Sequence, residues 1–248
     1  MSVEAVLDRQ VQRLALAGSG APCMRTLLLT VADPGRAREF IGSLLADGLL
    51  AFGPRGTARG LDGLASIGFT SAGLRALGAP APLLATLRDR SPAYAQGAVP
   101  RAARFLGDAG ESAAERWDAA FDARRVHAWV AVHAGDPATL DAAVARMRGL
   151  RGAAQGFDGW TPSGDLPDGR RLRDPDDPEA SRVHFGFRDA ITRPSILDGD
   201  GRLPPQGPGG GADRPRPGEL LLGYPDNDGA DLWTAGDDVA AEVADLLR

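Results

Sequence analysis

The chain has 248 residues, 25% of them charged, and a net charge of −5 without a basic cluster, so neither a nucleic-acid-binding surface nor a membrane span of ~18 apolar residues is expected. All 28 basic residues are arginine, which excludes mechanisms that need an enzyme amine, and the single cysteine, Cys23, excludes a disulfide within the chain. Charged residues precede any apolar stretch at the N-terminus, so we expect no secretory signal and a cytoplasmic location.

The first strong element is an apolar, β-type run that predicts a strand near 26–32. It ends at Asp33-Pro34, where an N-cap residue is followed by proline at the first helical position. A helix is therefore expected from Pro34 to about Leu45, with apolar residues on one face.

A second strand is expected near 65–70, and Thr70-Ser71 caps a short helix that runs through Leu77. Residues 79–125 are rich in proline and are expected to be irregular, apart from a helix around Ala113 to Phe121.

A third strand is expected near 126–133, followed by Asp136-Pro137, which repeats the cap-and-proline pattern. The helix that begins there places Leu140, Val144, Met147 and Leu150 on one stripe. A last strand is expected near 152–158.

Together these elements read β-α-β-β-α-β, which is the ferredoxin-like plan of an α+β domain. We expect one antiparallel sheet with the two longer helices on one face. The predicted units are an N-terminal extension, a ferredoxin-like domain, a loop region that carries the candidate site, and an acidic turn with a helix: 1–24, 25–160, 161–226 and 227–248.

The histidines do not form a metal site by spacing. His127 and His133 are about 20 Å apart along one strand, and His184 has no cysteine or histidine at ligand spacing. The preferred interpretation is that all three are structural or surface residues. The carboxylates of the loop at 174–179 are read as solvated rather than cation-binding.

One segment of the sequence has the features of a proton-transferring site. Asp189 lies within an apolar stretch, between Arg188 and Arg193, just before a proline-forced turn. Partial burial raises the pKa of such a carboxyl, while the arginines oppose that shift, which suits a group that moves protons. The alternative is a structural ion pair between Asp189 and one of the arginines.

This segment, Gly186–Pro194, resembles the distal-haem motif of the dye-decolorizing (DyP-type) peroxidases, G-x-x-D-G followed by I-S-x-P. Three further blocks are similar to signatures of that family and occur in the family's order. They are Ile67–Gly78, Leu106-Gly107-Asp108 with Trp117 after it, and Pro217–Tyr224.

The resemblance implies a haem b enzyme that oxidises bulky phenols and dyes with hydrogen peroxide, built from two ferredoxin-like domains in a dimeric α+β barrel architecture. It implies that Asp189 is the distal acid–base residue. It also implies that the surrounding segment lines the haem, through Phe187, Asp189, Ala190, Ile191, Thr192 and Arg193.

Two departures limit what the resemblance implies. Ala190 stands where the family has a second glycine, and alanine is strained if that position needs a positive φ. The family's proximal haem histidine and distal arginine lie in a second domain, and no histidine follows Tyr224 in this chain. The chain therefore resembles the N-terminal half of a peroxidase.

Three functions remain open. The chain is a peroxidase component completed by a second polypeptide, or a non-catalytic interaction protein that has lost haem, or a small haem binder that uses a replacement ligand such as His184.

The apolar stretches Val183–Ile191 and Leu220–Tyr224 lead us to expect an exposed patch. We therefore expect a homodimer or a complementary C-terminal half chain as partner.

Overall fold

The computed structural model describes most of the N-terminal two thirds of the chain and shorter stretches beyond it. The described residues are 11–16, 19–53, 63–118, 121, 125–160, 168–177, 180–188, 215–219 and 225–230. Predictions that concern other residues lie outside this part of the chain.

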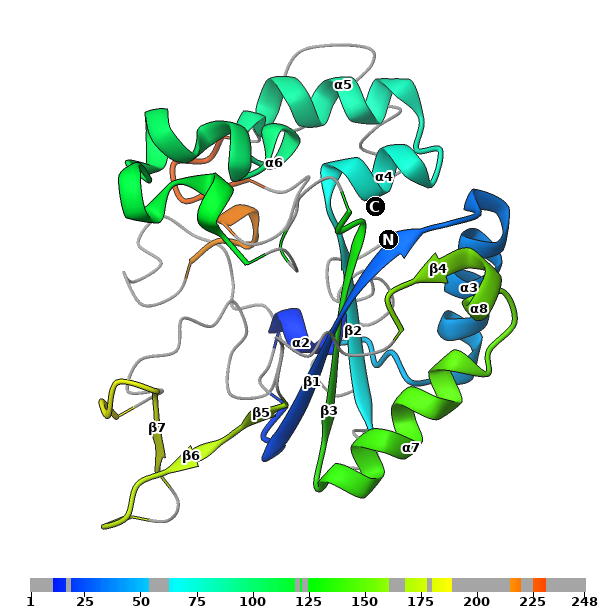
Figure 1. Cartoon of the computed structure of the whole chain (residues 1–248), viewed down its shortest axis with the longest axis vertical. Coiled ribbons are helices and arrows are strands. Elements are labelled where there is room, and N and C mark those ends of the chain that lie inside the picture. Colours follow the sequence, from blue (N-terminus) through cyan, green and yellow to red (C-terminus); the bar gives the residue numbers. More distant parts are fainter. Residues whose placement is uncertain are drawn as a thin grey trace.

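The centre of the structure is an antiparallel sheet with the strand order β2-β3-β1-β4 (Figure 1). Its strands are β1 (Cys23–Val31), β2 (Leu64–Phe69), β3 (Ala128–Ala134) and the short β4 (Phe157–Asp158). This order and the antiparallel pairing confirm the expected ferredoxin-like sheet. A further short strand, β5 (Gly169–Arg170), pairs with the start of β1.

Two helices begin at the predicted cap-and-proline sites. α3 (Pro34–Asp47) is capped by Asp33, whose carboxylate accepts a hydrogen bond from the Arg36 amide at 2.8 Å. α7 (Pro137–Arg148) is capped by Asp136, which accepts from the Thr139 amide at 2.9 Å. Both caps satisfy amide groups that have no partner within the helix, so the local sequence sets both helix starts.

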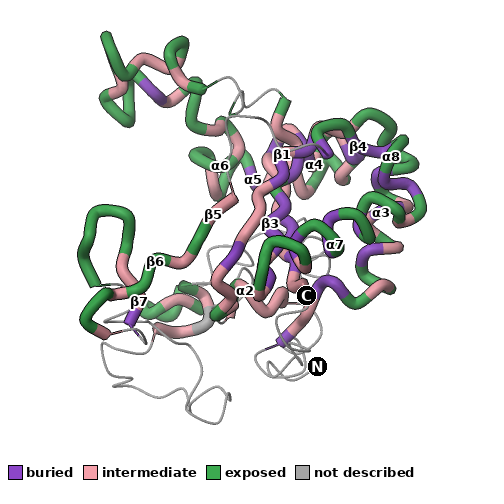
Figure 2. Tube along the Cα trace, turned by 60° about the horizontal axis from the view of Figure 1, so that its bottom comes forward, coloured by how far each residue is buried: buried purple, intermediate pink, exposed green. Residues whose placement is uncertain are grey.

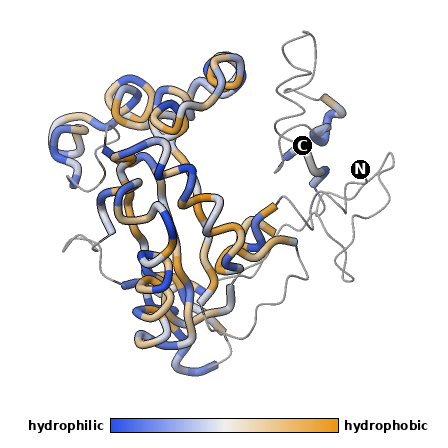
Figure 3. The backbone as a smooth tube through the Cα atoms, turned by 90° about the vertical axis from the view of Figure 1, so that its right-hand side faces the viewer, coloured by the Kyte–Doolittle hydropathy of each residue, from blue (hydrophilic) through white to orange (hydrophobic). Residues whose placement is uncertain are grey.

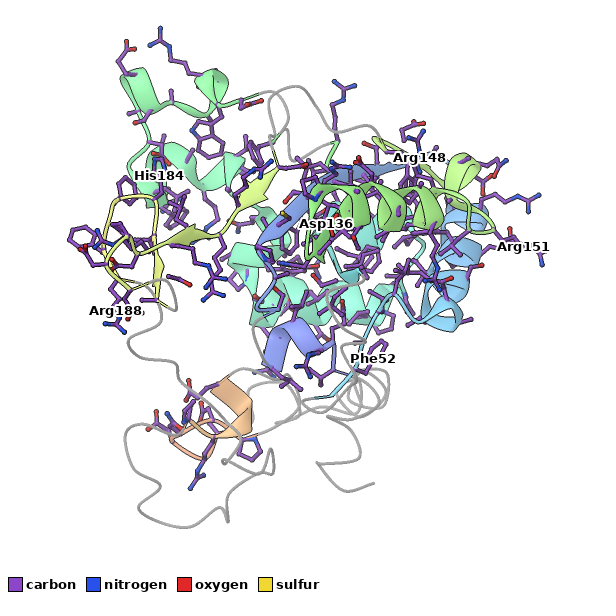
Figure 4. The ribbon with its side chains drawn as sticks, turned by 90° about the horizontal axis from the view of Figure 1, so that it is seen from below. Phe52, Asp136, Arg148, Arg151, His184 and Arg188 are labelled. Carbon is purple, nitrogen blue, oxygen red and sulfur yellow. The ribbon has the colours of Figure 1, made fainter. Side chains whose placement is uncertain are left out.

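Both helices lie on the same side of the sheet, whereas the short helix α2 (Arg13–Leu16) lies on the other side (Figures 1 and 4). Leu27 and Leu29 on β1 and Val130 on β3 are buried in the same core cluster as residues of α3 and α7. Figure 2 shows buried stretches along β1, β3, α3 and α7. Apolar residues recur along the strands and the helices that cover them (Figure 3). The core is therefore the layer between the sheet and these two helices.

The segment after α7 differs from the prediction. A strand near 152–158 is wrong for most of its length, because α8 (Ala153–Gly156) is helical and only β4 is extended. Gly152 has a φ of +81°, and a Cβ at Gly156 would lie 2.6 Å from the Ala37 amide nitrogen. These two glycines let α8 pack closely against α3, so the segment serves helix packing rather than the sheet.

The aromatic side chains that follow α8 close one end of the core. The ring of Phe40 meets those of Phe157 and Trp160 edge-on, at centroid distances of 5.6 and 5.2 Å. The Trp160 indole donates a hydrogen bond to the Ala153 carbonyl at 3.0 Å. The geometry of these pairs is the one aromatic rings prefer, and it fixes β4 beside β1.

The insertion between β2 and β3 is also more regular than predicted. The short helix α4 (Ser71–Ala76) begins after Thr70 as expected. Two helices that the sequence did not predict follow it, α5 (Ala81–Arg90) and α6 (Pro92–Gln96). The helix expected around 113–121 is wrong, since its described residues form short 3-10 turns. The remaining turns are η1 (Val99–Arg101), the π-helical η2 (Ala102–Leu106), η3 (Gly110–Ser112) and η4 (Ala114–Arg116).

Candidate functional site

The candidate motif is approached through a β-hairpin. β7 (Ser181–Arg182) pairs with β6 (Leu172–Arg173) and then turns at Val183. The Val183 amide donates to the Phe187 carbonyl, and the Gly186 amide donates to the Val183 carbonyl, each at 2.9 Å. Gly186 has a φ of +86°, the left-handed conformation that closes a three-residue hairpin loop. The described part of the hairpin ends at Arg188, the residue immediately before Asp189.

The tip of this hairpin is aromatic and exposed. Phe185 and Phe187 are 82% and 72% exposed, and the exposed His184 ring meets Phe185 edge-on at 5.3 Å. Figure 4 shows His184 and Arg188 on this hairpin, well away from Asp136 at the start of α7. Phe187, predicted to line the haem, therefore lies on a surface that another group can reach.

Carboxylates of the preceding loop neutralise the arginines of the hairpin. Arg182 contacts Asp174 through Nε at 2.9 Å and Nη2 at 3.0 Å, and this hydrogen bonding lowers the pKa of Asp174. Arg188 lies 3.7 Å from Asp177. The loop predicted to be solvated thus supplies counterions to the arginines of the hairpin. Within the described ranges, no cluster of side chains could hold a metal ion.

The other predicted site residues cannot be placed. Asp189, Ala190, Ile191, Thr192 and Arg193 lie outside the described residues, so the choice between an acid–base group and a structural ion pair stays a prediction. Among the described residues, the Arg188 guanidinium lies 3.7 Å from the Asp177 carboxylate.

Two of the three histidines, His127 and His133, have a hydrogen-bond partner at Nδ1. The His127 Nδ1 accepts a hydrogen bond from the Val31 amide at 3.0 Å, so the neutral ring carries its proton on Nε2 and offers no free nitrogen to a metal. The His133 Nδ1 lies 3.0 Å from the Ser19 hydroxyl, and burial lowers the pKa of His133. His184 is the exposed hairpin residue. The described residues therefore do not by themselves build a haem pocket with an axial ligand.

The sequence analysis missed an arginine that anchors the segment leading to the hairpin. Arg25, on β1, donates to both oxygens of Asp168 at 2.7 Å and to Asp141 of α7 at 2.7 Å. The hydrogen bond from Arg25 lowers the pKa of Asp168, whose side chain is only 29% exposed. A bidentate pair of this kind fixes geometry as well as charge. It holds β5, and with it the start of the site-bearing region, against the sheet.

Another missed contact fixes the junction between β2 and α4. The Thr70 hydroxyl donates to the Val126 carbonyl at 2.8 Å and accepts from the Gly73 amide at 3.0 Å. The Thr70 amide donates to the His127 carbonyl at 3.0 Å. Local sequence predicted Thr70 as a cap, but its long-range partners carry no sequence signal.

Comparison with known proteins confirms the resemblance seen in the sequence. Residues 62–155 match the family model described as "DyP dimeric alpha+beta barrel domain". This range contains two of the four sequence blocks, Ile67–Gly78 and the block from Leu106 to Trp117, but neither the Asp189 motif nor Pro217–Tyr224. None of the curated proteins compared with the chain matches it.

Solved structures of dye-decolorizing peroxidases share the fold. DyP2 from Amycolatopsis sp. ATCC 39116 aligns with a TM-score of 0.62 and 19% identity, covering 81% of this chain and 40% of that one. The DyP-type peroxidase of Anabaena sp. aligns with a TM-score of 0.61 and 18% identity, covering 78% and 40%. A dye-decolorizing peroxidase in complex with 2,6-dimethoxyphenol aligns with a TM-score of 0.60 and 19% identity, covering 90% and 46%. The chain thus spans less than half the length of each.

No helix within the described ranges has both the length and the apolar character to cross a membrane.

Proposed function

We propose, on the premise that residues 62–155 form a DyP-type domain, that the chain is the distal-side component of a haem peroxidase. It would use hydrogen peroxide to oxidise bulky aromatic compounds such as phenols and dyes. The match of residues 62–155 to the DyP domain model carries this proposal. The Arg25–Asp168 pair, which ties the start of the segment that leads to the Asp189 motif to the sheet, supports it, because an anchored scaffold is needed to hold a catalytic loop.

The roles follow from the resemblance of the motif. Asp189 accepts a proton from one oxygen of hydrogen peroxide and donates it to the other, which is general acid–base work by one carboxyl group. Phe187, Ala190, Ile191, Thr192 and Arg193 would line a bound haem b. Bound haem supplies the redox chemistry that amino-acid side chains lack.

The proximal ligand comes from a second polypeptide in this proposal. The Nδ1 atoms of His127 and His133 already have partners in the described structure, and His184 is exposed. In this proposal the ligand comes from a complementary C-terminal half chain, because another copy of this chain carries the same three histidines; a homodimer stays a prediction for association alone. A cytoplasmic location stays a prediction from the sequence.

The second candidate function is that of a non-catalytic interaction protein with the DyP fold. The exposed aromatic hairpin tip favours it, because Phe185 and Phe187 together form an apolar surface suited to contact with another protein. The third possibility raised by the sequence, haem ligation by His184 alone, gains no support from the exposed position of that ring.

The Asp189→Asn variant tests the proposal, because asparagine keeps the size of the side chain but cannot relay a proton. In the haem-loaded assembly of this chain with its complementary half, stopped-flow mixing with hydrogen peroxide should show a reaction slowed by ~10²- to 10⁴-fold, with haem binding nearly unchanged. Asp177→Asn is the matched control, since it removes a carboxylate from the same region and should leave the rate unchanged. An unchanged rate in Asp189→Asn would overturn the catalytic role, and a lowered melting temperature alone would support a structural ion pair.

A further inference from the structure

The hairpin that leads to the Asp189 motif lies beside the main sheet rather than within it. Figure 1 shows β6 and β7 beyond β5, apart from the strands that α3 and α7 cover. The Arg171 amide, one residue before β6, donates to the Pro22 carbonyl at 2.8 Å and ties the start of the hairpin to the chain entering β1. Each strand of the hairpin is only two residues long. Strands this short are marginally stable alone, so side-chain contacts have to help fix the turn that follows them.

Arg182 makes such a contact with the loop between β6 and β7. Its Nη2 donates to Asp174 Oδ1 at 3.0 Å, and its Nε lies 2.9 Å from Asp174 Oδ2. The Asp174 side chain is only 13% exposed, and its Oδ1 also accepts from the Asp176 amide at 2.9 Å. The loop therefore holds the carboxylate in place, and two nitrogens of one planar group contact its two oxygens, which fixes geometry as well as charge.

The third nitrogen of the same guanidinium contacts the turn after β7. Arg182 Nη1 donates a long hydrogen bond of 3.4 Å to the Gly186 carbonyl. The next carbonyl, that of Phe187, accepts from the Val183 amide at 2.9 Å and closes the turn. One planar group thus joins the β6–β7 loop to the turn that carries Phe187. A lysine has a single nitrogen and could not span both partners.

The second ion pair of the hairpin constrains it less. Arg188 Nη2 lies 3.7 Å from Asp177 Oδ2, and the two side chains are 61% and 49% exposed. Exposed ion pairs contribute little, because water screens them and two long side chains must be ordered to form them. Of the two arginines, Arg182 is therefore the one whose loss should change the turn more.

We propose that Arg182 is a positioning residue for the peroxidase reaction. By joining Asp174 to the Gly186 carbonyl, it fixes the turn that carries Phe187 and the direction in which the chain enters the Asp189 motif. The inference rests on the proposed function, because the role given there to Asp189 makes this direction matter. Misplacing a reacting group by about 1 Å can slow a reaction by ~10²-fold, so a contact away from the reacting atoms can set the rate.

Hydrogen exchange at the Val183 and Gly186 amides tests the contact on the full chain without haem. Arg182→Lys keeps the charge but not the planar fork, and Asp174→Asn keeps the size of the partner but not its charge. Both variants should speed exchange at these amides by roughly 5-fold, the factor that one net hydrogen bond supplies. Asp176→Asn is the matched control, because it removes an exposed carboxylate from the same loop and keeps the amide that donates to Asp174. Circular dichroism checks the folding of each variant.

The peroxide reaction of the haem-loaded assembly separates positioning from a purely structural role. Arg182→Lys should slow this reaction by at least ~10-fold with haem binding nearly unchanged, whereas Asp176→Asn should react as the wild type does. In the Asp189→Asn background, Arg182→Lys should have little further effect, because a residue that acts through Asp189 has nothing left to position.

Unchanged exchange at Val183 and Gly186 in folded Arg182→Lys would overturn the proposal, as would equal slowing by Arg182→Lys in the wild-type and Asp189→Asn backgrounds. If Asp189→Asn slows the peroxide reaction and Arg182→Lys does not, the positioning role fails and the proposed function stands. If Asp189→Asn reacts as fast as the wild type, the catalytic role of Asp189 fails and the positioning role fails with it.

Discussion

The side-chain amide of Gln12 pairs with the backbone of Ile67 in the way that a neighbouring strand would. Its Nε2 donates to the Ile67 carbonyl and its Oε1 accepts from the Ile67 amide, both at 2.8 Å. The two residues are 55 positions apart. One side chain thereby completes the hydrogen bonding at the centre of the β2 edge.

Gln12→Ala removes both hydrogen bonds and should expose the Ile67 amide. One net hydrogen bond contributes about 1 kcal/mol, so we expect hydrogen exchange at Ile67 to speed up by roughly 5- to 10-fold. The Ala65 amide, which donates to the Leu49 carbonyl, is the internal control and should exchange as before. Equal protection of Ile67 in variant and wild type would show that the pairing does not persist in solution.

Gly73→Ala should destabilise the protein strongly. A Cβ atom at Gly73 would lie 1.9 Å from the carbonyl oxygen of His127, which is backbone and cannot rotate away. Overpacking of this kind costs about 1–3 kcal/mol or more in free energy of unfolding, measured by urea denaturation. Gly42→Ala, in open surroundings within α3, should instead add ~0.5–1 kcal/mol. The account fails here if Gly73→Ala is as stable as Gly42→Ala.

Asp168→Asn should lower stability at neutral pH by ~1–3 kcal/mol, because the Arg25 side chain is only 15% exposed and loses a bidentate partner. Since the pKa of Asp168 is held below its usual 3.8, the wild type keeps this contribution above about pH 4 and loses it as the pH falls through the folded pKa. Urea denaturation between pH 7 and pH 2 should therefore show a flatter acid dependence for the variant.

Asp141→Asn is the control for that experiment. Asp141 also contacts Arg25, but its side chain is 68% exposed, so its loss should cost no more than ~1 kcal/mol. Equal effects of the two substitutions would argue against the anchoring role of Asp168.

Local signals explain which parts of the fold the sequence predicts. Asp33-Pro34 and Asp136-Pro137 act within one helical turn, so both helix starts are confirmed. The missed helix α6 also begins at a proline, Pro92, but the many prolines of residues 79–125 predict irregular structure there. Proline at the first helical position begins a helix as readily as it ends one, and tertiary contacts decide between the two.

The features of the fold that the sequence does not predict depend on contacts between residues far apart in the chain. The expected strand at 152–158 depended on apolar content, whereas Gly152 and Gly156 act by letting α8 approach α3. Arg25 and Asp168 lie 143 residues apart, and nothing in either local pattern indicates the pair. For the candidate site, the sequence indicates the motif around Asp189, and the structure adds the hairpin that leads to it and the Arg25–Asp168 pair that precedes this hairpin.

The most direct test of the central claim is a haemin titration followed at the Soret band. It should be run on the chain alone and on the chain mixed with a separately expressed C-terminal domain of a DyP-type peroxidase. If the chain is the distal-side component, the completed assembly should show saturable haemin binding with a shifted Soret band, and Asp189→Asn should bind haemin equally well. If a folded chain shows no saturable Soret change in either arm, the peroxidase function is contradicted and the interaction protein takes its place.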